Sequence, residues 1–307
     1  MLNLNLVTVI ASVVIVLAIG YFAKKTKIFK KEDASVLNNV IIYIALPVLI
    51  FRGIYSARLI GSLTYIPIIA LSITSLLVVI AYLIARILKL DKQLTGTFML
   101  AAAVGNTGYI AYPLLIELFG NKGLVRGIFY DMFGTVIFML TIGIFICSKF
   151  GSSETKPTVI RSFASFPPLY FLILGFAMRG VVLPEVLMKS IDLVANITIG
   201  LILIAVGLSL EISKAAKRYL PLISITFLLK LLMAPTFAYI LASSFNLQPI
   251  SMSSVHLSSS MPTALLTLVF GLKFKLNIEF LSSVIFILTI ASVVTVPVGQ
   301  WLLHIAV

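Results

Sequence analysis

The sequence has few charged residues. Only 11% of its 307 residues are Asp, Glu, Lys or Arg, against roughly a quarter in an average soluble domain, whereas 61% are hydrophobic. A bilayer-spanning helix needs about 20 consecutive, mostly apolar residues, so the chain has room for about nine or ten such helices and little else. This composition excludes a soluble globular domain, a disordered chain and a single-anchor receptor. Because the apolar runs are continuous and do not alternate with polar residues, it also argues against a membrane β-barrel.

Cysteine and histidine are almost absent. The single cysteine, Cys147, cannot form an internal disulfide, and two histidines with one cysteine make a protein-built zinc site improbable. The sequence contains no His-Glu-x-x-His, phosphate-loop or dinucleotide-binding pattern. Ser259 and Ser260 lie three and four residues after His256, on one helix face, but no carboxylate is evident to orient the histidine. We therefore predict no metal, no cofactor and no enzymatic activity.

Uncharged windows predict ten membrane-spanning helices. From 219 to 272 the only formal charge is Lys230, and that stretch is too long for one helix, so the Phe-Asn-Leu-Gln-Pro run at 245–249 divides it into an eighth and a ninth span. The other eight windows cover residues 4–23, 34–51, 59–85, 93–116, 132–148, 162–178, 193–210 and 280–307. The predicted fold class is an all-α integral membrane protein.

The distribution of basic residues predicts the orientation, because Lys and Arg are retained on the cytoplasmic side. One set of loops carries sixteen of the 23 basic residues: Lys24, Lys25, Lys27, Lys30, Lys31, Arg86, Lys89, Lys92, Lys149, Lys156, Arg161, Lys214, Lys217, Arg218, Lys273 and Lys275. The opposite set carries six. We expect a protein of the cytoplasmic membrane with both termini outside. The net charge of +13 is mostly this topological signal, and since no basic soluble domain is present, we expect no nucleic-acid partner.

The chain divides into two halves. The longest polar connection predicts a first repeat at 1–150, a cytoplasmic linker at 151–162 and a second repeat at 163–307. Each half holds five spans, and an odd number forces the halves into opposite orientations. If they share a fold, they form an inverted repeat, which is common among secondary transporters.

The fourth and ninth spans share a pattern that predicts a broken helix in each. Both have small or polar residues, a proline in mid-span, an apolar run and Phe-Gly. Broken helices at this depth are tolerated only in protein or beside a wet cavity, and their ends hold ions or polar substrates. The alternative is a kinked helix whose polar side chains bond to its neighbours. The predicted substrate-binding residues are Asn106, Thr107, Gly108, Tyr109, Pro113, Ser259, Ser260, Pro262 and Thr263.

Two charged residues lie inside predicted spans. Lys230 lies close to the midplane, where it either attracts an anionic substrate or forms a buried ion pair, for example with Asp131. Asp131 is a candidate for proton or ion coupling, or a partner of Lys230 or Arg126. His256 is a second coupling candidate, and the alternative is a buried structural histidine. We interpret Pro67, Pro235 and Pro297 as ordinary kinks.

The sequence resembles the auxin efflux carrier family in its compact prokaryotic form. Three stretches carry the resemblance: ALPVLIFR at 45–52, GNTGYIAYPLL at 105–115 and KLLMAP at 230–235. It implies a fold related to the bile acid–sodium symporters, with a scaffold domain of helices 1, 2, 6 and 7 and a transport domain of helices 3–5 and 8–10. Helices 4 and 9 would cross at their breaks, with Pro113 and Pro262 as the crossover prolines. It also implies transport of organic anions by an elevator-type movement and a homodimer through the scaffold.

The sequence departs from that pattern at the ninth span. Plant members have an asparagine beside the proline, whereas Ser260 and Met261 precede Pro262 here, and no acid lies near the break, so sodium coupling is not supported. Few aromatic residues other than Tyr109 and Tyr112 lie at the breaks. We therefore predict a secondary carrier for a small carboxylate, such as malate or malonate, in preference to an auxin-like acid. The alternative is an anion channel or a uniporter without ion coupling.

Overall fold

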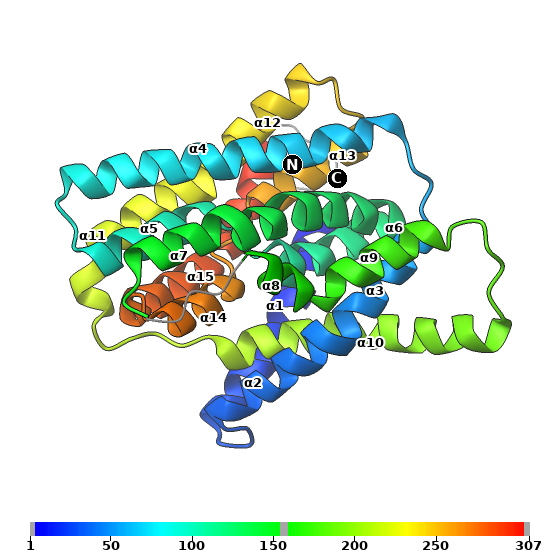
Figure 1. The fold of residues 1–307 in the computed structure, drawn as a ribbon, viewed down its shortest axis with the longest axis horizontal. Coiled ribbons are helices and arrows are strands. Elements are labelled where there is room, and N and C mark those ends of the chain that lie inside the picture. The colour runs from blue at the N-terminus through cyan, green and yellow to red at the C-terminus, as the bar shows by residue number, and fades with distance from the viewer. Residues whose placement is uncertain (1–3, 154–158, 304–307) are drawn as a thin grey trace.

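The computed structural model of the chain describes residues 4–153 and 159–303. In these ranges all regular elements are helices, and the one pairing of β type is an isolated antiparallel bridge between Gly105 and Thr263 (Figure 1). The elements are α1 (Leu4–Lys25), α2 (Lys31–Val40), η1 (Ile41–Ala45), α3 (Leu46–Tyr55), η2 (Gly61–Thr64), α4 (Tyr65–Ile87), α5 (Lys92–Ala103), η3 (Thr107–Ala111), α6 (Tyr112–Tyr130), η4 (Asp131–Val136), η5 (Met139–Gly143), α7 (Ile144–Phe150), α8 (Val159–Ala164), α9 (Pro167–Ala177), α10 (Glu185–Ser209), α11 (Ala216–Phe227), η6 (Leu228–Met233), α12 (Ala234–Ser244), α13 (Pro249–Ser259), α14 (Leu265–Phe274) and α15 (Ile278–Leu302).

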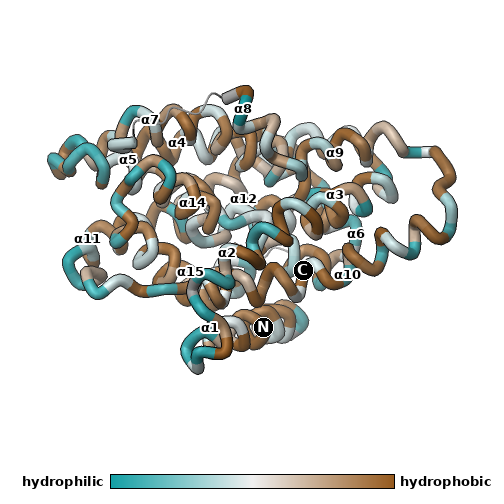
Figure 2. Tube along the Cα trace, turned by 60° about the horizontal axis from the view of Figure 1, so that its bottom comes forward, coloured by the Kyte–Doolittle hydropathy of each residue, from teal (hydrophilic) through white to brown (hydrophobic). Residues whose placement is uncertain are grey.

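The length and hydropathy of its helices identify the chain as a membrane protein. Among the described residues, seven helical segments are long and apolar enough to cross a bilayer. They are Asn5–Lys25, Glu32–Tyr55, Gly61–Ile87, Thr107–Phe150, Glu185–Ser209, Ala216–Ser244 and Ile278–Leu302. Two shorter apolar helices, Pro167–Ala177 and Leu265–Phe274, accompany them. Figure 2 shows hydrophobic residues along the helices and hydrophilic ones gathered at helix ends and connections. The predicted all-α membrane class is confirmed.

The segment Thr107–Phe150 folds back on itself. As one straight helix its 44 residues would extend about 66 Å, more than twice the thickness of the hydrocarbon core. Gly120 interrupts it with φ 58° and ψ −147°, a conformation that a residue with a side chain rarely adopts. The Tyr112 hydroxyl donates to Oδ2 of Asp131 at 2.9 Å, although nineteen residues separate them. The segment is therefore a helical hairpin that reverses at Gly120.

Wide π-helical turns precede three of the prolines. Each of η1, η3 and η6 ends two residues before a proline, namely Pro47, Pro113 and Pro235. Proline has no N–H and its ring crowds the carbonyl four residues earlier, so the regular ladder cannot continue unchanged. The chain instead bonds across five residues, as in Tyr112 N–H to the Thr107 carbonyl. Pro235 thus does more than kink its helix, because the wide turn before it contains Lys230.

Helices α1 and α10 cross with their backbones in contact. A Cβ atom on Gly20 would lie 2.3 Å from the Ile204 carbonyl oxygen, and one on Gly207 would lie 2.0 Å from that of Leu17. Only glycine fits at either position. In addition, α3 packs against α9 and α10, so these four helices form one connected group.

The predicted linker at 151–162 is only partly covered by the structure. Residues 154–158 lie outside the described ranges, and α8 begins at Val159, so the last residues of the predicted linker are helical.

Candidate functional site

Two interrupted helices cross at the centre of the molecule. Helix α5 ends at Ala103 and η3 begins at Thr107, with extended backbone at Val104 between them. Helix α13 ends at Ser259 and α14 begins at Leu265. The two interruptions run antiparallel to each other, in agreement with the bridge between Gly105 and Thr263.

Hydrogen bonds between the interruptions satisfy the backbone groups that the broken helices leave free. Asn106 N–H donates to the Pro262 carbonyl at 2.7 Å, and Ala264 N–H donates to the Val104 carbonyl at 3.0 Å. The Thr263 hydroxyl donates to the carbonyl of Ala101, on α5, at 2.7 Å. Unpaired backbone groups at membrane depth are costly, so these bonds explain how two helices can be open here.

The two prolines predicted to mark the crossing are placed differently. Pro262 lies in the interruption between α13 and α14, and its carbonyl accepts from Asn106. Pro113 lies in the first turn of α6, beyond the π-helical η3. The expectation that Pro113 lies at the crossing is therefore wrong. Its missing N–H widens the helix after the interruption, while small and polar residues form the interruption itself.

The two glycines of the Gly-Asn-Thr-Gly run each make room for a charged side chain. A Cβ on Gly105 would lie 2.9 Å from Nζ of Lys230, and a Cβ on Gly108 would lie 3.0 Å from Oδ2 of Asp131. Both charged residues are buried, at 3% and 4% exposure. The interrupted segment therefore lies against a basic and an acidic group at the same time.

Asp131 and Lys230 do not pair with each other. The carboxylate of Asp131 accepts hydrogen bonds from the hydroxyls of Thr107 and Tyr112, and Nζ of Lys230 donates to the Ser259 carbonyl at 3.3 Å. Arg126 bonds instead to the hydroxyl of Ser251, at 2.8 Å, and to a backbone carbonyl. In the described part of the chain, the ion pairs considered for Asp131 are thus not formed.

A cavity of about 110 Å³ lies beside the crossing. One wall is the start of η3 together with Asn106 and Asp131, and another is the start of α14, with Leu265, Leu266, Leu268 and Val269. The lining also includes Asn38 and Ser209, from α2 and α10. The cavity therefore lies between the two interrupted helices and a separate group of helices.

The cavity is lined by two helix starts and by one unpaired side-chain donor. The first N–H groups of a helix have no partner inside it, and the starts of both η3 and α14 line this space. Nδ2 of Asn106 is buried without a hydrogen-bond partner, and its residue is 4% exposed. Because buried polar groups are nearly always paired, this amide points to a missing acceptor.

The predicted site residues divide into two sets. Those that line the cavity are Asn106, Thr107, Gly108, Tyr109 and Asp131. Those outside its lining are Pro113, Lys230, His256, Ser259, Ser260, Pro262 and Thr263. Sequence reasoning missed Asn38 and Ser209, which meet through a hydrogen bond of 3.4 Å from the Asn38 amide. Their only sequence signal is a polar residue near the end of an apolar span.

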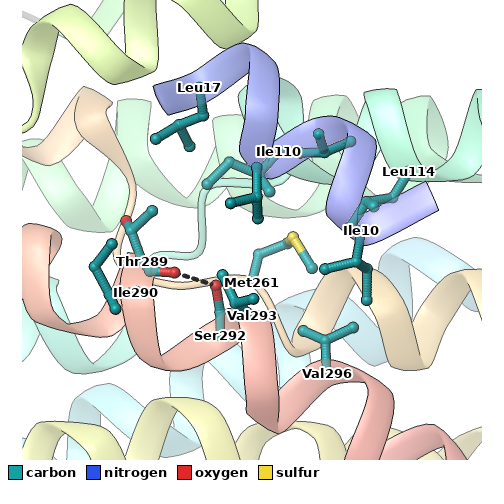
Figure 3. A pocket seen from close by; sticks show the side chains of 12 residues that line it. Ile10, Leu17, Ile110, Leu114, Met261, Thr289, Ile290, Ser292, Val293 and Val296 are labelled. Carbon is teal, nitrogen blue, oxygen red and sulfur yellow. Dashed lines mark hydrogen bonds between the residues drawn. The ribbon is translucent and has the colours of Figure 1, made fainter. Parts of the chain in front are cut away.

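A second cavity, of about 50 Å³, lies on the other side of the crossing, around Met261 (Figure 3). Its walls are aliphatic residues of α1 and α15, with Ile110 and Leu114 beside them. The hydroxyls of Thr289 and Ser292 are its few polar groups, and Ser292 donates to the Thr289 carbonyl. This space offers neither charge nor helix N-termini, so it does not suit a polar substrate.

His256 is buried against the end of α15. Its Nδ1 is 2.8 Å from the side-chain nitrogen of Gln300, and its Nε2 has no partner. The hydroxyls of Ser259 and Ser260 both donate to the backbone carbonyl of His256 and not to its ring. The described residues thus contain no serine–histidine pair here, and they contain no group of three His, Cys, Asp or Glu side chains suited to a metal.

Comparison with known proteins decides the family. The family model for "Membrane transport protein" matches residues 5–299, which is nearly the whole chain. The chain belongs to this family, that of the auxin efflux carriers. The resemblance seen in the three sequence stretches is therefore confirmed.

The most informative relatives are transporters by name. An uncharacterized transporter of Methanocaldococcus jannaschii is 32% identical over 305 residues, covering 96% of this chain and 98% of the relative. One of Methanothermobacter thermautotrophicus is 34% identical over 294 residues, covering 94% and 95%. A protein of Rhizobium meliloti with the provisional name malonate transporter is 27% identical over 289 residues, covering 91% and 89%. Family and relatives are thus transporters and not enzymes.

Proposed function

We propose that this protein is a secondary carrier that moves a small organic anion, a carboxylate of the malate or malonate kind, across the cytoplasmic membrane. One observation carries the proposal. The starts of two half-helices and the unpartnered amide of Asn106 converge on one cavity between two groups of helices. Membership of the membrane transport protein family supports it independently.

The electrostatics of the crossing favour an anion. A helix carries partial positive charge at its N-terminus and partial negative charge at its C-terminus. Three carbonyls at the C-terminal ends are occupied: those of Ala101 and Val104 accept from the opposite interruption, and that of Ser259 accepts from Lys230. The N-terminal ends of η3 and α14 face the cavity instead. An anion entering the cavity would meet these positive helix ends, which suit carboxylates and phosphates, together with the unpartnered amide of Asn106.

The surroundings favour a small aliphatic carboxylate. Most of the remaining lining is aliphatic, and Tyr109 and Phe166 are its only aromatic residues among those described. The relative from Rhizobium meliloti is named for malonate, which agrees with this size. An auxin-like indole acid would need more aromatic surface, so we place it second.

A carboxylate substrate would share the cavity with Asp131. Two buried carboxylates at short range repel each other, so binding is favoured when a proton enters with the substrate. Asp131 is the coupling residue in this scheme, because it lines the cavity, whereas His256 does not. A uniporter or an anion channel is the alternative, and it would show no proton dependence.

The proposed architecture is ten spans in two inverted five-helix repeats. Seven long segments are the starting point of this count. The hairpin at Gly120, the interrupted α13–α14 pair and the short helix α9 would each add one span. Helices α1, α3, α9 and α10 pack together, which supports a scaffold against which the remaining helices shift in an elevator-type movement. Asn38, Phe166 and Ser209 lie near the basic loops, so the cavity opens toward the cytoplasm if the charge bias sets the orientation.

Transport by purified protein in liposomes tests the proposal. We expect saturable uptake of radiolabelled malonate or malate, accelerated by unlabelled substrate inside, since exchange of this kind marks a carrier. Asn106→Ala should remove uptake, and Asn121→Ala serves as the matched control, because that amide bonds to the Gly53 carbonyl outside the cavity. Non-saturating flux without counterflow would favour a channel, and no flux with any small carboxylate would reject the proposal.

A further inference from the structure

Lys230 is a buried cation that touches no acid in the described part of the chain. It lies near the middle of the apolar segment Ala216–Ser244, in the wide turn η6, and is 3% exposed. Its ammonium donates a hydrogen bond to the Ser259 carbonyl at 3.3 Å. Placing a lysine at this depth is costly, so its position calls for a specific reason.

The reason lies at the end of α13. Ser259 is the last residue of this helix, and the final carbonyls of a helix lack internal partners and carry partial negative charge. The nearby hydroxyls of Ser259 and Ser260 donate one turn back, to the carbonyl of His256, and so do not donate to the Ser259 carbonyl. In the described structure the Ser259 carbonyl receives its donor from Lys230.

We propose that Lys230 is a positioning residue, a tethered ammonium ion that caps the carbonyl end of α13 and thereby holds the crossing in the geometry that places the Asn106 amide in the cavity. It contacts neither the cavity nor the substrate, since it is outside the cavity lining. Lys230 acts on Asn106 indirectly, through the backbone between Ser259 and Pro262. Ser259 is three residues before Pro262, whose carbonyl binds the backbone N–H of Asn106.

Gly105 is the counterpart of this cap. The ammonium lies where a Cβ on residue 105 would be 2.9 Å away, with the Lys230 Cε at 3.1 Å. A side chain there would displace the end of Lys230 from the carbonyl it serves. The first glycine of the Gly-Asn-Thr-Gly run is therefore needed to make room for the Lys230 side chain as well as to form the interruption.

Two readouts test the inference. The first, hydrogen exchange of residues 104–107 and 259–264, needs no substrate; the second, the KM for malonate uptake, rests on the proposed function. In Lys230→Met, which keeps an unbranched apolar stem but lacks the charged nitrogen, we expect faster exchange in both segments and a KM raised by about tenfold or more, the range for loss of a bond from a charged donor. Lys230→Arg should retain most of both properties.

Chemical rescue distinguishes loss of the ammonium charge from general damage to the packing around residue 230. In Lys230→Ala, added ethylammonium or propylammonium should restore slow exchange and lower the KM, whereas ethanol and propanol of similar size should not. Gly105→Ala should reproduce the Lys230→Met phenotype and resist rescue, because the space itself is filled. Lys189→Met is the matched control, since that lysine is exposed and pairs with Glu185.

The outcomes are distinct. If Lys230→Met exchanges and transports like the unmodified protein, the inference is overturned while the proposed function stands. If exchange responds as expected but no carboxylate is transported by any variant, the cap stands and the proposed function fails. If Lys230→Met does not fold, Lys230→Ala purified in ethylammonium replaces it, and instability equal with and without the amine overturns the inference.

Discussion

Oδ2 of Asp131 lies so close to Gly108 that a Cβ on the glycine would be only 3.0 Å away. The second glycine of the Gly-Asn-Thr-Gly run thus lets a buried carboxylate approach the start of η3, where Thr107 donates to it. A contact of 3.0 Å cannot be kept without displacing one of the two groups. The candidate site therefore depends on the absence of a side chain as much as on the side chains present.

Gly108→Ala should impair the site while leaving the fold intact. The added methyl group pushes the Asp131 carboxylate away from Thr107 and Tyr112, which line up to donate to it. We expect malonate uptake to fall by about tenfold or more, the effect of losing a charge-assisted hydrogen bond. Uptake in liposomes checks this, with Gly200→Ala as control, since a Cβ there meets open space.

Asp131→Asn should separate transport from the proton gradient. Asparagine keeps the shape and still accepts from Thr107, but it carries no titrating group. We expect substrate exchange to survive and stimulation of uptake by an imposed pH gradient to disappear. A variant that still responds to the gradient would place the coupling group elsewhere, and His256→Gln would then be measured in the same assay.

Thr263→Val should lower stability through one lost hydrogen bond. The two side chains have nearly the same shape, but valine cannot donate to the Ala101 carbonyl, which now receives this bond at 2.7 Å. Leaving that buried acceptor unpaired costs about 1–3 kcal/mol. Thermal unfolding in detergent measures the change. Thr236→Val is the control, because its hydroxyl is exposed and bonds only within its own helix.

Gly207→Leu should disrupt the contact between α1 and α10. A Cβ at this position would lie 2.0 Å from the Leu17 carbonyl oxygen, so the helices must separate. Overpacking costs about 1–3 kcal/mol or more, and here it acts on backbone that cannot rotate away. We expect a lower unfolding temperature and poor recovery of folded protein. Unchanged stability would mean that the two backbones do not touch.

Sequence alone was sufficient for the membrane class and for the stretches that break. The scarcity of charge indicates membrane helices directly, and the glycine, asparagine and threonine at 105–108 cannot face lipid. Which residues meet across the molecule could not be predicted in the same way. Asn38 and Ser209 belong to distant helices, and only the fold brings them together at the cavity.

Local propensity also failed to separate two uses of proline. In the sequence Pro113 and Pro262 occupy matching positions, yet one lies inside a helix and the other in the non-helical interruption between α13 and α14. Proline disturbs a helix in either case, and whether the helix widens or opens depends on partners across the crossing. Likewise, the sequence around Lys230 predicts that this side chain is buried, but not that it donates a hydrogen bond to the Ser259 carbonyl.

The bridge between Gly105 and Thr263 joins residues from opposite halves of the chain. When the ribosome has delivered only the first half of the chain, the backbone groups of Val104 and Asn106 lack these partners, which arrive only with residues 262–264. Until then the segment at 104–106 must stay in contact with water or the translocation machinery, or adopt a transient helical form. The candidate site is therefore among the last features to assemble, and a truncation that removes the second half should leave a first half in which residues 104–106 cannot adopt the conformation seen here.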